Sequence, residues 1–337
     1  MAFQTDILNI LSKGERPTPS MVEAALISIL NGEAEKDQIK TFLGGLEAIG
    51  VTAAEVSVGT KVMRDNMIPV ETGYDVIDIV GTGGTGLHTL SISTATAFVC
   101  AGAAAKVAKH GNRAASSLTG TADTLSTLGV NLAMSPEKAA ECIDQAGIGF
   151  LFAPKHHPAM RHVGPARKEL GIKTLFNLLG PLCNPAGAKR MLLGVAEDRW
   201  REPMAKALLE RDCEHIWVVH GEDGMDEITL TGTTKVSEVK NGEYREFTIN
   251  PVEYGFSLCS LDELRGGEPS VNAERLRELL IGKVDPYRDI VLLNAGAALM
   301  IAGVKDNLQD AIQEAIWSLE DHRALNALET LIQVSNA

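Results

Sequence analysis

The glycine-rich run GTGGTG, residues 81–86, constrains the fold of this chain more than any other stretch. It follows the apolar segment DVIDIV, which ends at Val80, and it precedes an apolar, helix-like stretch that reaches about Gly102. A strand that enters a glycine-rich turn and then a helix is typical of anion-binding loops, because backbone N–H groups converge there and the helix N-terminus carries partial positive charge. The pattern predicts a bound phosphate-like anion at this turn.

The charges around this turn support that prediction. The 44 residues from Ile79 to Ala122 contain no Asp or Glu, although the whole chain has 44 acidic residues among 337. Chance would place about six acidic residues in such a window. The window does contain basic and imidazole side chains: Lys106, Lys109, Arg113, His88 and His110. An acidic chain has therefore kept one loop system free of acids, as a site for an anion requires.

Composition argues against several classes of protein. A net charge of −13 and a pI near 5.1 disfavour binding to nucleic acid or to an anionic membrane. The five cysteines are scattered without a CxxC pair, so they predict neither a disulfide framework nor a zinc site. The N-terminus lacks a signal-peptide apolar region, and the longest apolar run, residues 290–304, is too short to cross a bilayer. We expect a cytoplasmic protein.

Two domains are predicted. Residues 1–69 indicate a small all-helical domain, because apolar residues recur there at three- and four-residue spacing. Residues 70–337 indicate a large α/β domain, whose alternating strands and helices predict a mostly parallel central sheet flanked by helices. Later segments, EITLTG (227–232) and TKVSEVKNGEYREFTI (234–249), are predicted to be antiparallel strands. A helix is expected from about Met160 to Leu170.

The glycine run admits other interpretations. Gly81, Gly83 and Gly86 fit the G-x-G-x-x-G pattern of dinucleotide sites, but the acid expected about 20 residues later is missing. No Lys-Ser/Thr pair follows the glycines, so the pattern of the nucleoside-triphosphate P-loop fails as well. A tight turn without a ligand is a further alternative, although four glycines in six residues exceed what a turn needs.

Hydroxyl and amide side chains follow two of the predicted strands. The SIST segment, Ser91 to Thr94, would begin the helix after the glycines, where its hydroxyls would either cap that helix or turn toward a phosphate or metal. The KHGNRAASS segment, Lys109 to Ser117, would emerge at the same edge of the sheet. It offers a point charge from Lys109 and a directional amide from Asn112. A basic surface loop is the alternative.

Three further sets of residues are candidates for chemistry. Asp226 and Glu227 stand together after a predicted strand, as Mg²⁺ ligands would, although an exposed acidic loop is the alternative. Arg167 would bind a carboxylate through two hydrogen bonds, unless it is an ordinary surface arginine. His156 and His157 lack a third ligand at useful spacing, so a zinc site is not predicted there.

The chain resembles the anthranilate phosphoribosyltransferases along essentially its whole length. The motifs that carry the resemblance are DIVGTGG, ISTA, AKHGNRAASS, GFLFAPKHHPAMRHVGPARKELG, FNLLGPLCNP and VVHGEDGMDEI. The resemblance implies a small helical domain that is completed by helices within about residues 160–185. It also implies a hinge beside the large domain and a homodimer formed through the helical domains.

The resemblance further implies an activity: transfer of the phosphoribosyl group of phosphoribosyl pyrophosphate to anthranilate in tryptophan biosynthesis, with Mg²⁺ as cofactor. Gly81, Asn112 and Arg167 would bind anthranilate, and Ser93, Asp226 and Glu227 would bind Mg²⁺. No residue is assigned as general acid or base, although His110 is a candidate. Phosphoribosyl pyrophosphate would contact Gly81, Gly84, Thr85, Thr89, Ser91, Ile92, Ser93, Thr94, Lys109, His110, Gly111, Asn112, Arg113, Ala114, Ala115, Ser116, Ser117 and Thr121.

Two positions depart from the family pattern. The family loop usually reads GTGGDG followed by NIST, whereas Thr85 replaces the Asp and Ser91 replaces the Asn in this chain. Both lie in the segment expected to hold phosphoribosyl pyrophosphate. The alternatives are a phosphoribosyltransferase or nucleoside phosphorylase of the same fold that acts on another amine or base, and a nucleic-acid-binding relative without enzymatic activity.

Overall fold

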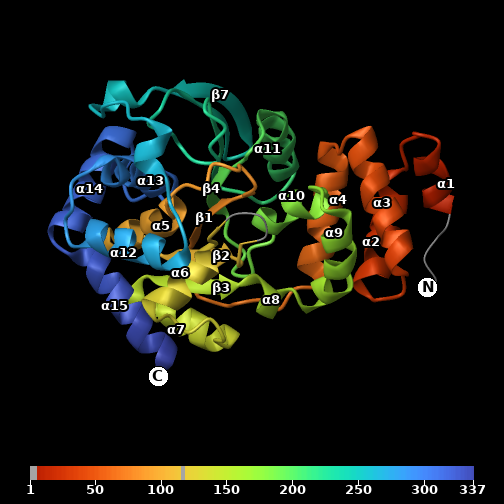
Figure 1. Ribbon diagram of the computed structural model, residues 1–337, viewed down its shortest axis with the longest axis horizontal. Helices are drawn as coiled ribbons and strands as arrows, with labels where there is room; N and C mark the ends of the chain where they lie inside the picture. The colour runs from red at the N-terminus through yellow and green to blue at the C-terminus, as the bar shows by residue number, and fades with distance from the viewer. Residues whose placement is uncertain (1–5, 115–117) are drawn as a thin grey trace.

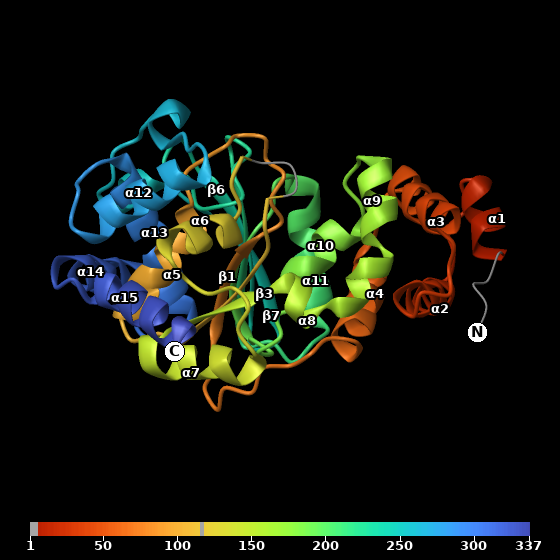
Figure 2. The same ribbon diagram turned by 60° about the horizontal axis from the view of Figure 1, so that its bottom comes forward.

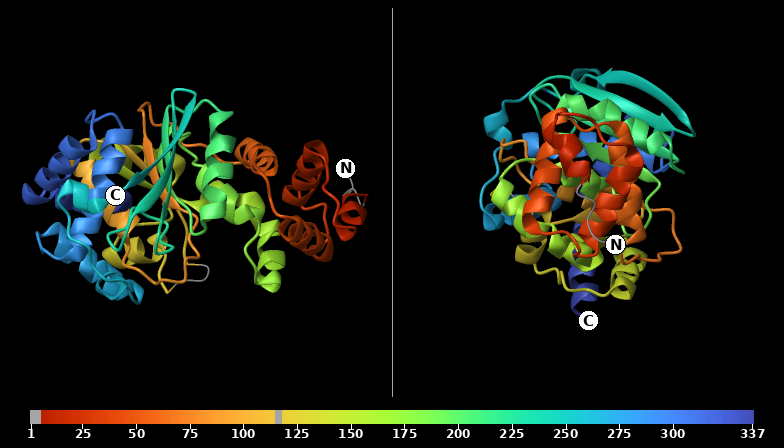
Figure 3. Two further views of the ribbon diagram at one scale, coloured as in Figure 1. Left: turned by 90° about the horizontal axis from the view of Figure 1, so that it is seen from above. Right: turned by 90° about the vertical axis from the view of Figure 1, so that its right-hand side faces the viewer.

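A seven-stranded sheet runs through the middle of the molecule, with helices on both faces (Figures 1 and 3). The computed structural model describes residues 6–114 and 118–337. The strand order is β3-β2-β1-β4-β5-β6-β7. The strands are β1 (Ile77–Gly81), β2 (Val107–Gly111), β3 (Ile148–Phe152), β4 (Arg190–Gly194), β5 (His215–Gly221), β6 (Thr234–Lys240) and β7 (Glu243–Ile249).

The first five strands pair in parallel, and β6 and β7 join them antiparallel. The predicted mostly parallel sheet is therefore confirmed, as is the hairpin at Asn241-Gly242. Four of the parallel strands, β1, β2, β4 and β5, end in a glycine at the same edge of the sheet. That edge is where ligands bind in open α/β sheets, because the loops after the strands converge there.

Alternating side chains build a core on each face of the sheet. On β4, Leu192 packs into one apolar cluster, whereas its neighbours Met191 and Leu193 pack into another. Successive side chains point to opposite faces of a strand, so a strand buried on both sides reads as a continuous apolar run. The cluster around Leu192 is completed by the helices α5 (Ile92–Gly102), α6 (Thr121–Leu128), α7 (Pro136–Ala146), α12 (Pro269–Leu280), α13 (Pro286–Ile301), α14 (Leu308–Glu320) and α15 (Arg323–Asn336).

The N-terminal helices form a separate group at one end of the molecule (Figures 1 and 2). They are α1 (Asp6–Ser12), α2 (Pro19–Leu30), α3 (Lys36–Ile49) and α4 (Ala53–Asp65). Two mid-chain helices, α9 (Gly164–Leu170) and α10 (Leu175–Leu182), pack against α3 and α4, as Figure 2 shows. α11 (Arg201–Leu209) continues this packing onto β5 and β6, so one apolar cluster extends from the N-terminal helices to the sheet.

Two predicted elements differ from the structure. The segment EITLTG forms no strand, because side chains take its backbone partners: Asn294 hydrogen-bonds both the N–H and the C=O of Ile228, at 3.0 and 2.8 Å. The helix expected from Met160 to Leu170 is divided at Val163 into a short 3₁₀ segment, η1 (Pro158–His162), and α9. Pro165 lies in the first turn of α9, where proline's missing N–H costs nothing.

The remaining elements are short. They are the helix α8 (Ala153–His156) and the 3₁₀ segments η2 (Asp198–Trp200), η3 (Pro251–Tyr254) and η4 (Leu261–Leu264). Across residues 6–114 and 118–337, none of the helices combines the length and the apolar character needed to cross a membrane.

Candidate active site

The glycine loop and the acidic loop meet at the carboxyl edge of the sheet. Asp226, which follows β5, accepts a hydrogen bond from the backbone N–H of Gly83 at 2.9 Å. A β-carbon on Gly81 would overlap the Asp226 carboxylate, and one on Gly194 would overlap the Asp226 carbonyl oxygen. Two strand ends must therefore be glycine, because the acidic loop passes directly against their backbones.

Lys109 lies beneath this meeting point. Its side chain is only 1% exposed, and its ammonium group donates hydrogen bonds to the Ile79 carbonyl at 2.5 Å and to the Ser93 hydroxyl at 3.2 Å. Burial lowers the pKa of Lys109 to about 8, although the nearby carboxylates of Asp78, Glu227 and Asp226 oppose that shift. Lys109 thus supplies buried positive charge to the site and does not extend into solvent.

The two carboxylates of the acidic loop are incompletely compensated. The Oε2 atom of Glu227 is shielded from solvent and finds no hydrogen-bond partner in the described part of the chain. Burial and the negative charge of Asp226 raise the pKa of Glu227 well above its usual range, and Lys109 counteracts them only in part. A small cavity lined by Ser93, Asp226 and Glu227 lies here, so the three predicted metal ligands come together in space. Such a group of acceptors is suited to a cation.

The hydroxyls at the start of α5 do not cap that helix. Ser91 stands at the N-cap but makes no side-chain bond to the helix backbone. Its hydroxyl instead shares a hydrogen bond with the Thr124 hydroxyl at 2.9 Å, and the Thr94 hydroxyl bonds that of Thr121 at 3.4 Å. The side chain of Ile92 is apolar and buried, so only its backbone could contact a polar ligand. The capping interpretation of these hydroxyls is therefore wrong.

The segment after β2 curves around a carboxylate that the sequence patterns did not single out. Asp123 accepts hydrogen bonds from the N–H groups of Ala114 and Gly120, at 3.0 and 3.1 Å, and pairs with the Arg113 guanidinium at 2.7 Å. Asn112 accepts a bond from the Arg113 N–H at 2.8 Å. The predicted residues Ala115, Ser116 and Ser117 lie outside the described residues. Asp123 follows the acid-free window directly, which was the available signal.

His110, on β2, is buried among other imidazoles. Its ring lies 5.1 Å from that of His157, and its Nε2 atom has no partner among the described residues. Burial lowers the pKa of His110 to about 3, with His157 and His156 adding to the effect. The ring is therefore neutral at physiological pH. The adjacent Gly111 ends β2 beside Phe150.

The remaining predicted residues of the glycine loop are placed as follows. The Thr85 hydroxyl accepts a hydrogen bond from the Leu87 N–H at 3.3 Å, which stabilises the turn locally. Thr89 forms an isolated antiparallel bridge with Arg265. Gly84 adopts a φ of +75° and is exposed. The loop thus presents backbone N–H groups rather than charged side chains of its own.

Arg167 lies on α9, across from the sheet edge. Its guanidinium donates to the Asn177 side-chain oxygen at 3.0 Å, and it lies 5.9 Å from the centre of the Phe176 ring. Burial lowers the pKa of Arg167. Within residues 6–114 and 118–337, Arg167 forms no ion pair with a carboxylate.

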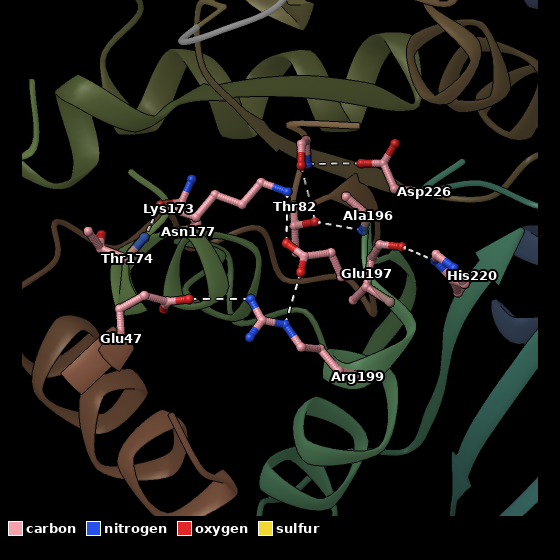
Figure 4. Close-up of polar contacts among 12 residues, drawn as sticks. Glu47, Thr82, Lys173, Thr174, Asn177, Ala196, Glu197, Arg199, His220 and Asp226 are labelled. Carbon is pink, nitrogen blue, oxygen red and sulfur yellow. Dashed lines mark hydrogen bonds and ion pairs between the residues drawn. The ribbon is translucent and has the colours of Figure 1, made fainter. Parts of the chain in front are cut away.

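A pocket between the glycine loop and the helical group contains residues that sequence reasoning missed (Figure 4). Lys173 pairs with Glu197 at 2.9 Å, and Thr82 accepts a hydrogen bond from the Ala196 N–H at 3.1 Å. The signal for Lys173 was its place in the short stretch between the motifs GFLFAPKHHPAMRHVGPARKELG and FNLLGPLCNP. Nothing in the sequence indicated that Glu197 would reach the same place. The pocket is lined by Glu47, Thr82, Gly83, Lys173, Thr174, Asn177, Leu178, Ala196, Glu197 and Trp200.

Comparisons with known proteins agree with this architecture. The family described as "Glycosyl transferase family, a/b domain" matches residues 73–325, and the one described as "Glycosyl transferase family, helical bundle domain" matches residues 5–67. The fold and these two family matches therefore define a glycosyltransferase with a helical bundle and an α/β domain.

Individual relatives are more specific. Over 308 residues, 91% of each chain, this chain is 50% identical to anthranilate phosphoribosyltransferase of Chelativorans sp. (strain BNC1) and 51% identical to that of Rhizobium rhizogenes. The crystal structure of the Thermus thermophilus enzyme has a TM-score of 0.92 at 40% identity, covering 98% of this chain and 100% of that one. The chain belongs to the anthranilate phosphoribosyltransferases.

A solved structure with ligands completes the comparison. Anthranilate phosphoribosyltransferase from Saccharomyces cerevisiae in complex with PRPP and Mg has a TM-score of 0.89 at 27% identity. It covers 99% of this chain, and this chain covers 98% of it.

Proposed function

We propose that this chain joins the phosphoribosyl group of phosphoribosyl pyrophosphate to the amine of anthranilate, giving N-(5-phosphoribosyl)anthranilate and pyrophosphate in tryptophan biosynthesis. The observation that carries this proposal is the hydrogen bond of 2.9 Å between Asp226 and Gly83. It joins a loop suited to a polyanion with a pair of carboxylates suited to a cation. The site therefore has the two kinds of ligand that a metal-bound pyrophosphate needs.

The site stabilises charge more than it transfers protons. Displacement at the anomeric carbon develops oxocarbenium character and releases pyrophosphate, so the largest catalytic contribution is stabilisation of the leaving group. The glycine-loop N–H groups and the Ser93 hydroxyl supply hydrogen bonds for it. An arylamine has a free lone pair at neutral pH, so no strong base is required, and His110 is neutral with its pKa near 3. Correct positioning of the amine is then the remaining requirement.

Ser93, Asp226 and Glu227 fit Mg²⁺, because the shielded Glu227 oxygen without a partner is an acceptor that a cation would satisfy. Mg²⁺ takes one or two carboxylates together with phosphate oxygens, which is the donor set available here. When bound, the ion adds positive charge beside the pyrophosphate. Lys109 holds the Ser93 hydroxyl in place from below.

Arg167 and Asn112 are assigned to anthranilate, together with the backbone at Gly81. The half-buried guanidinium of Arg167 has an amide as its recorded partner, so a carboxylate ligand would form its strongest interaction. Asn177 fixes the orientation of Arg167, and its side-chain oxygen also accepts the Thr174 N–H at 2.9 Å. These contacts fix the position of the Arg167 guanidinium on α9.

The test is a fluorescence assay that follows the loss of anthranilate with phosphoribosyl pyrophosphate and Mg²⁺. We expect turnover that requires all three components. Turnover with another amine or a nucleobase, and none with anthranilate, would contradict the proposal. Removal of Mg²⁺ by EDTA is expected to stop the reaction, and added Mg²⁺ is expected to restore it.

The proposal also covers the domain boundary, the quaternary structure and the cellular location of the protein. The boundary between the domains is placed near residue 69, and α9 and α10 belong structurally to the helical domain because they pack on α3 and α4. A homodimer through this domain is part of the same proposal, as the family resemblance implies. All five cysteines carry free thiols, which is typical of the reducing cytoplasm.

A further inference from the structure

Lys173 lies directly against the glycine loop although it comes from the segment between α9 and α10. A β-carbon built on Gly84 would be 3.1 Å from the Lys173 Cε atom and 3.7 Å from its Nζ atom. The side chain is 43% exposed, so the ammonium group is accessible at the mouth of the site. It is a cation placed beside the backbone that is expected to meet phosphate.

The present partner of Lys173 can release it at little cost. Glu197 is 34% exposed, and exposed ion pairs contribute little to stability. Its other oxygen, Oε2, is 2.9 Å from the Arg199 Nε atom, and Arg199 reaches Glu47 on α3 at 3.3 Å (Figure 4). Glu197 therefore keeps a positive neighbour if Lys173 leaves. By contrast, a phosphate without Lys173 would face a loop whose own side chains carry no positive charge.

We propose that Lys173 is a further substrate-positioning residue, which exchanges Glu197 for a phosphate oxygen of phosphoribosyl pyrophosphate bound at the glycine loop. The inference rests on the proposed function, because that function supplies the polyphosphate ligand. In the absence of substrate, the ion pair with Glu197 keeps the Lys173 side chain next to Gly84. The exchange replaces a singly charged carboxylate by a more highly charged phosphate, so the electrostatic attraction of the ammonium group to its partner increases.

The first test compares Lys173→Met with Lys173→Arg. We expect Lys173→Met to raise the KM for phosphoribosyl pyrophosphate by roughly ten- to hundredfold, the range for loss of a hydrogen bond between charged groups. The KM for anthranilate and kcat should change by less than about threefold, because the lysine acts on binding of one substrate. Lys173→Arg should retain most of the affinity. Calorimetric titration with inorganic pyrophosphate and Mg²⁺ should show the same loss without any turnover.

The second test is Glu197→Gln, which distinguishes a substrate-positioning role of Lys173 from a purely structural role of its ion pair with Glu197. If Glu197 only holds the lysine, this change leaves the KM for phosphoribosyl pyrophosphate unchanged or lowers it, because the lysine loses a competitor. If the ion pair is purely structural, both variants lower the melting temperature and raise both KM values together, and the inference is wrong. An unchanged KM in Lys173→Met would also overturn it. The proposed function fails separately, if the wild-type chain does not consume anthranilate.

Discussion

Two glutamates, Glu238 on β6 and Glu227 in the loop after β5, differ in how well the protein pairs a carboxylate that is shielded from solvent. Glu238, on β6, is 2% exposed and accepts hydrogen bonds from His215 at 2.8 Å and Trp217 at 2.7 Å, while Arg245 pairs with its other oxygen. Glu227, at the carboxyl edge, has an oxygen without a partner among the described residues and a second carboxylate beside it. One carboxylate is satisfied by the protein, and the other is not.

The pKa values follow this difference. For Glu238, burial acts to raise the pKa, but the hydrogen bonds from Arg245, Trp217 and His215 outweigh it and lower the pKa to about 2. For Glu227, burial and Asp226 both act in the same direction and raise the pKa. A buried charge that the protein satisfies indicates a structural role, whereas one that it leaves unsatisfied indicates a missing ligand. Substitutions at the two sites should therefore separate stability from activity.

The largest effect is expected from Glu227→Ala or Asp226→Ala. We expect kcat/KM to fall by at least about a thousandfold, because ligands of a charge-stabilising cation are lost. The free energy of unfolding should stay the same or rise in Glu227→Ala, since that change removes one of two like charges. It should fall slightly in Asp226→Ala, which also loses the hydrogen bond from the Gly83 N–H. Assays across a Mg²⁺ titration, together with thermal melts, measure both quantities.

Glu227→Gln is the matched control for shape, because the amide keeps the size of the side chain and removes its charge. It should behave like Glu227→Ala in turnover and be at least as stable as the wild type. Mg²⁺ with pyrophosphate should raise the melting temperature of the wild type more than that of this variant. Wild-type rates at limiting Mg²⁺ in both alanine variants would remove the metal role.

Glu238→Ala should give the reverse outcome. We expect it to destabilise the fold by about 3 kcal/mol, because His215 and Trp217 lose their shared acceptor, while both KM values remain near those of the wild type. Because the folded-state pKa is lowered from 4.5 to about 2, Glu238 stabilises the fold fully above about pH 4.5 and loses that contribution as the pH falls toward 2. Denaturant unfolding at pH 7 and pH 3 should show a smaller pH dependence in the variant.

Glu243→Ala is the control for that series, because Glu243 is an exposed residue on β7 at the end of the same hairpin. Its free energy of unfolding should stay within about 0.5 kcal/mol of the wild type. Equal losses in Glu243→Ala and Glu238→Ala would show that the hairpin responds to any substitution, and the comparison of the two buried glutamates would then fail.

Much of the fold was predictable because its signals are local. The glycine run, the alternation of strands and helices, and Asn241-Gly242 each depend on a few adjacent residues. EITLTG was wrong because its backbone partners are side chains, chiefly Asn294, which lies 66 positions away from Ile228. A period-two apolar pattern cannot reveal such a partner.

The site was predictable in its composition and less so in its geometry. The family resemblance identified Ser93, Asp226 and Glu227 as one group, and the structure places them around one cavity. The sequence did not indicate that Lys109 would be fully buried. A lysine next to a polar loop is expected to be exposed unless the packing around its strand is known. Glu197 and Asp123 were missed because their partners come from distant segments or from backbone N–H groups.

Arg167→Ala should have a smaller effect, confined to one substrate. We expect the KM for anthranilate to rise roughly ten- to hundredfold, because a carboxylate ligand loses a charge-assisted pair. The KM for phosphoribosyl pyrophosphate should hardly change. Lys168→Ala, a neighbour on α9, is the control and should leave both constants unchanged. If weaker use of phosphoribosyl pyrophosphate accompanied an unchanged anthranilate KM, Arg167 would belong to the other substrate.

The smallest effect is expected at Thr85, where an added carboxylate would bring a further unpaired negative charge into the glycine loop. In Thr85→Asp the new side chain can accept the same Leu87 N–H that the threonine hydroxyl accepts at 3.3 Å, so the turn should persist. The added charge then faces pyrophosphate, and only a metal at the loop would convert repulsion into attraction.

Ser91 has also departed from the family pattern, and its hydroxyl is hydrogen-bonded to that of Thr124. We therefore expect the KM for phosphoribosyl pyrophosphate to rise about two- to tenfold, and more when Mg²⁺ is scarce. Thr85→Asn, which keeps the shape without the charge, should stay near the wild type. A lower KM in Thr85→Asp at every Mg²⁺ concentration would show instead that the loop binds a metal and lacks a ligand for it.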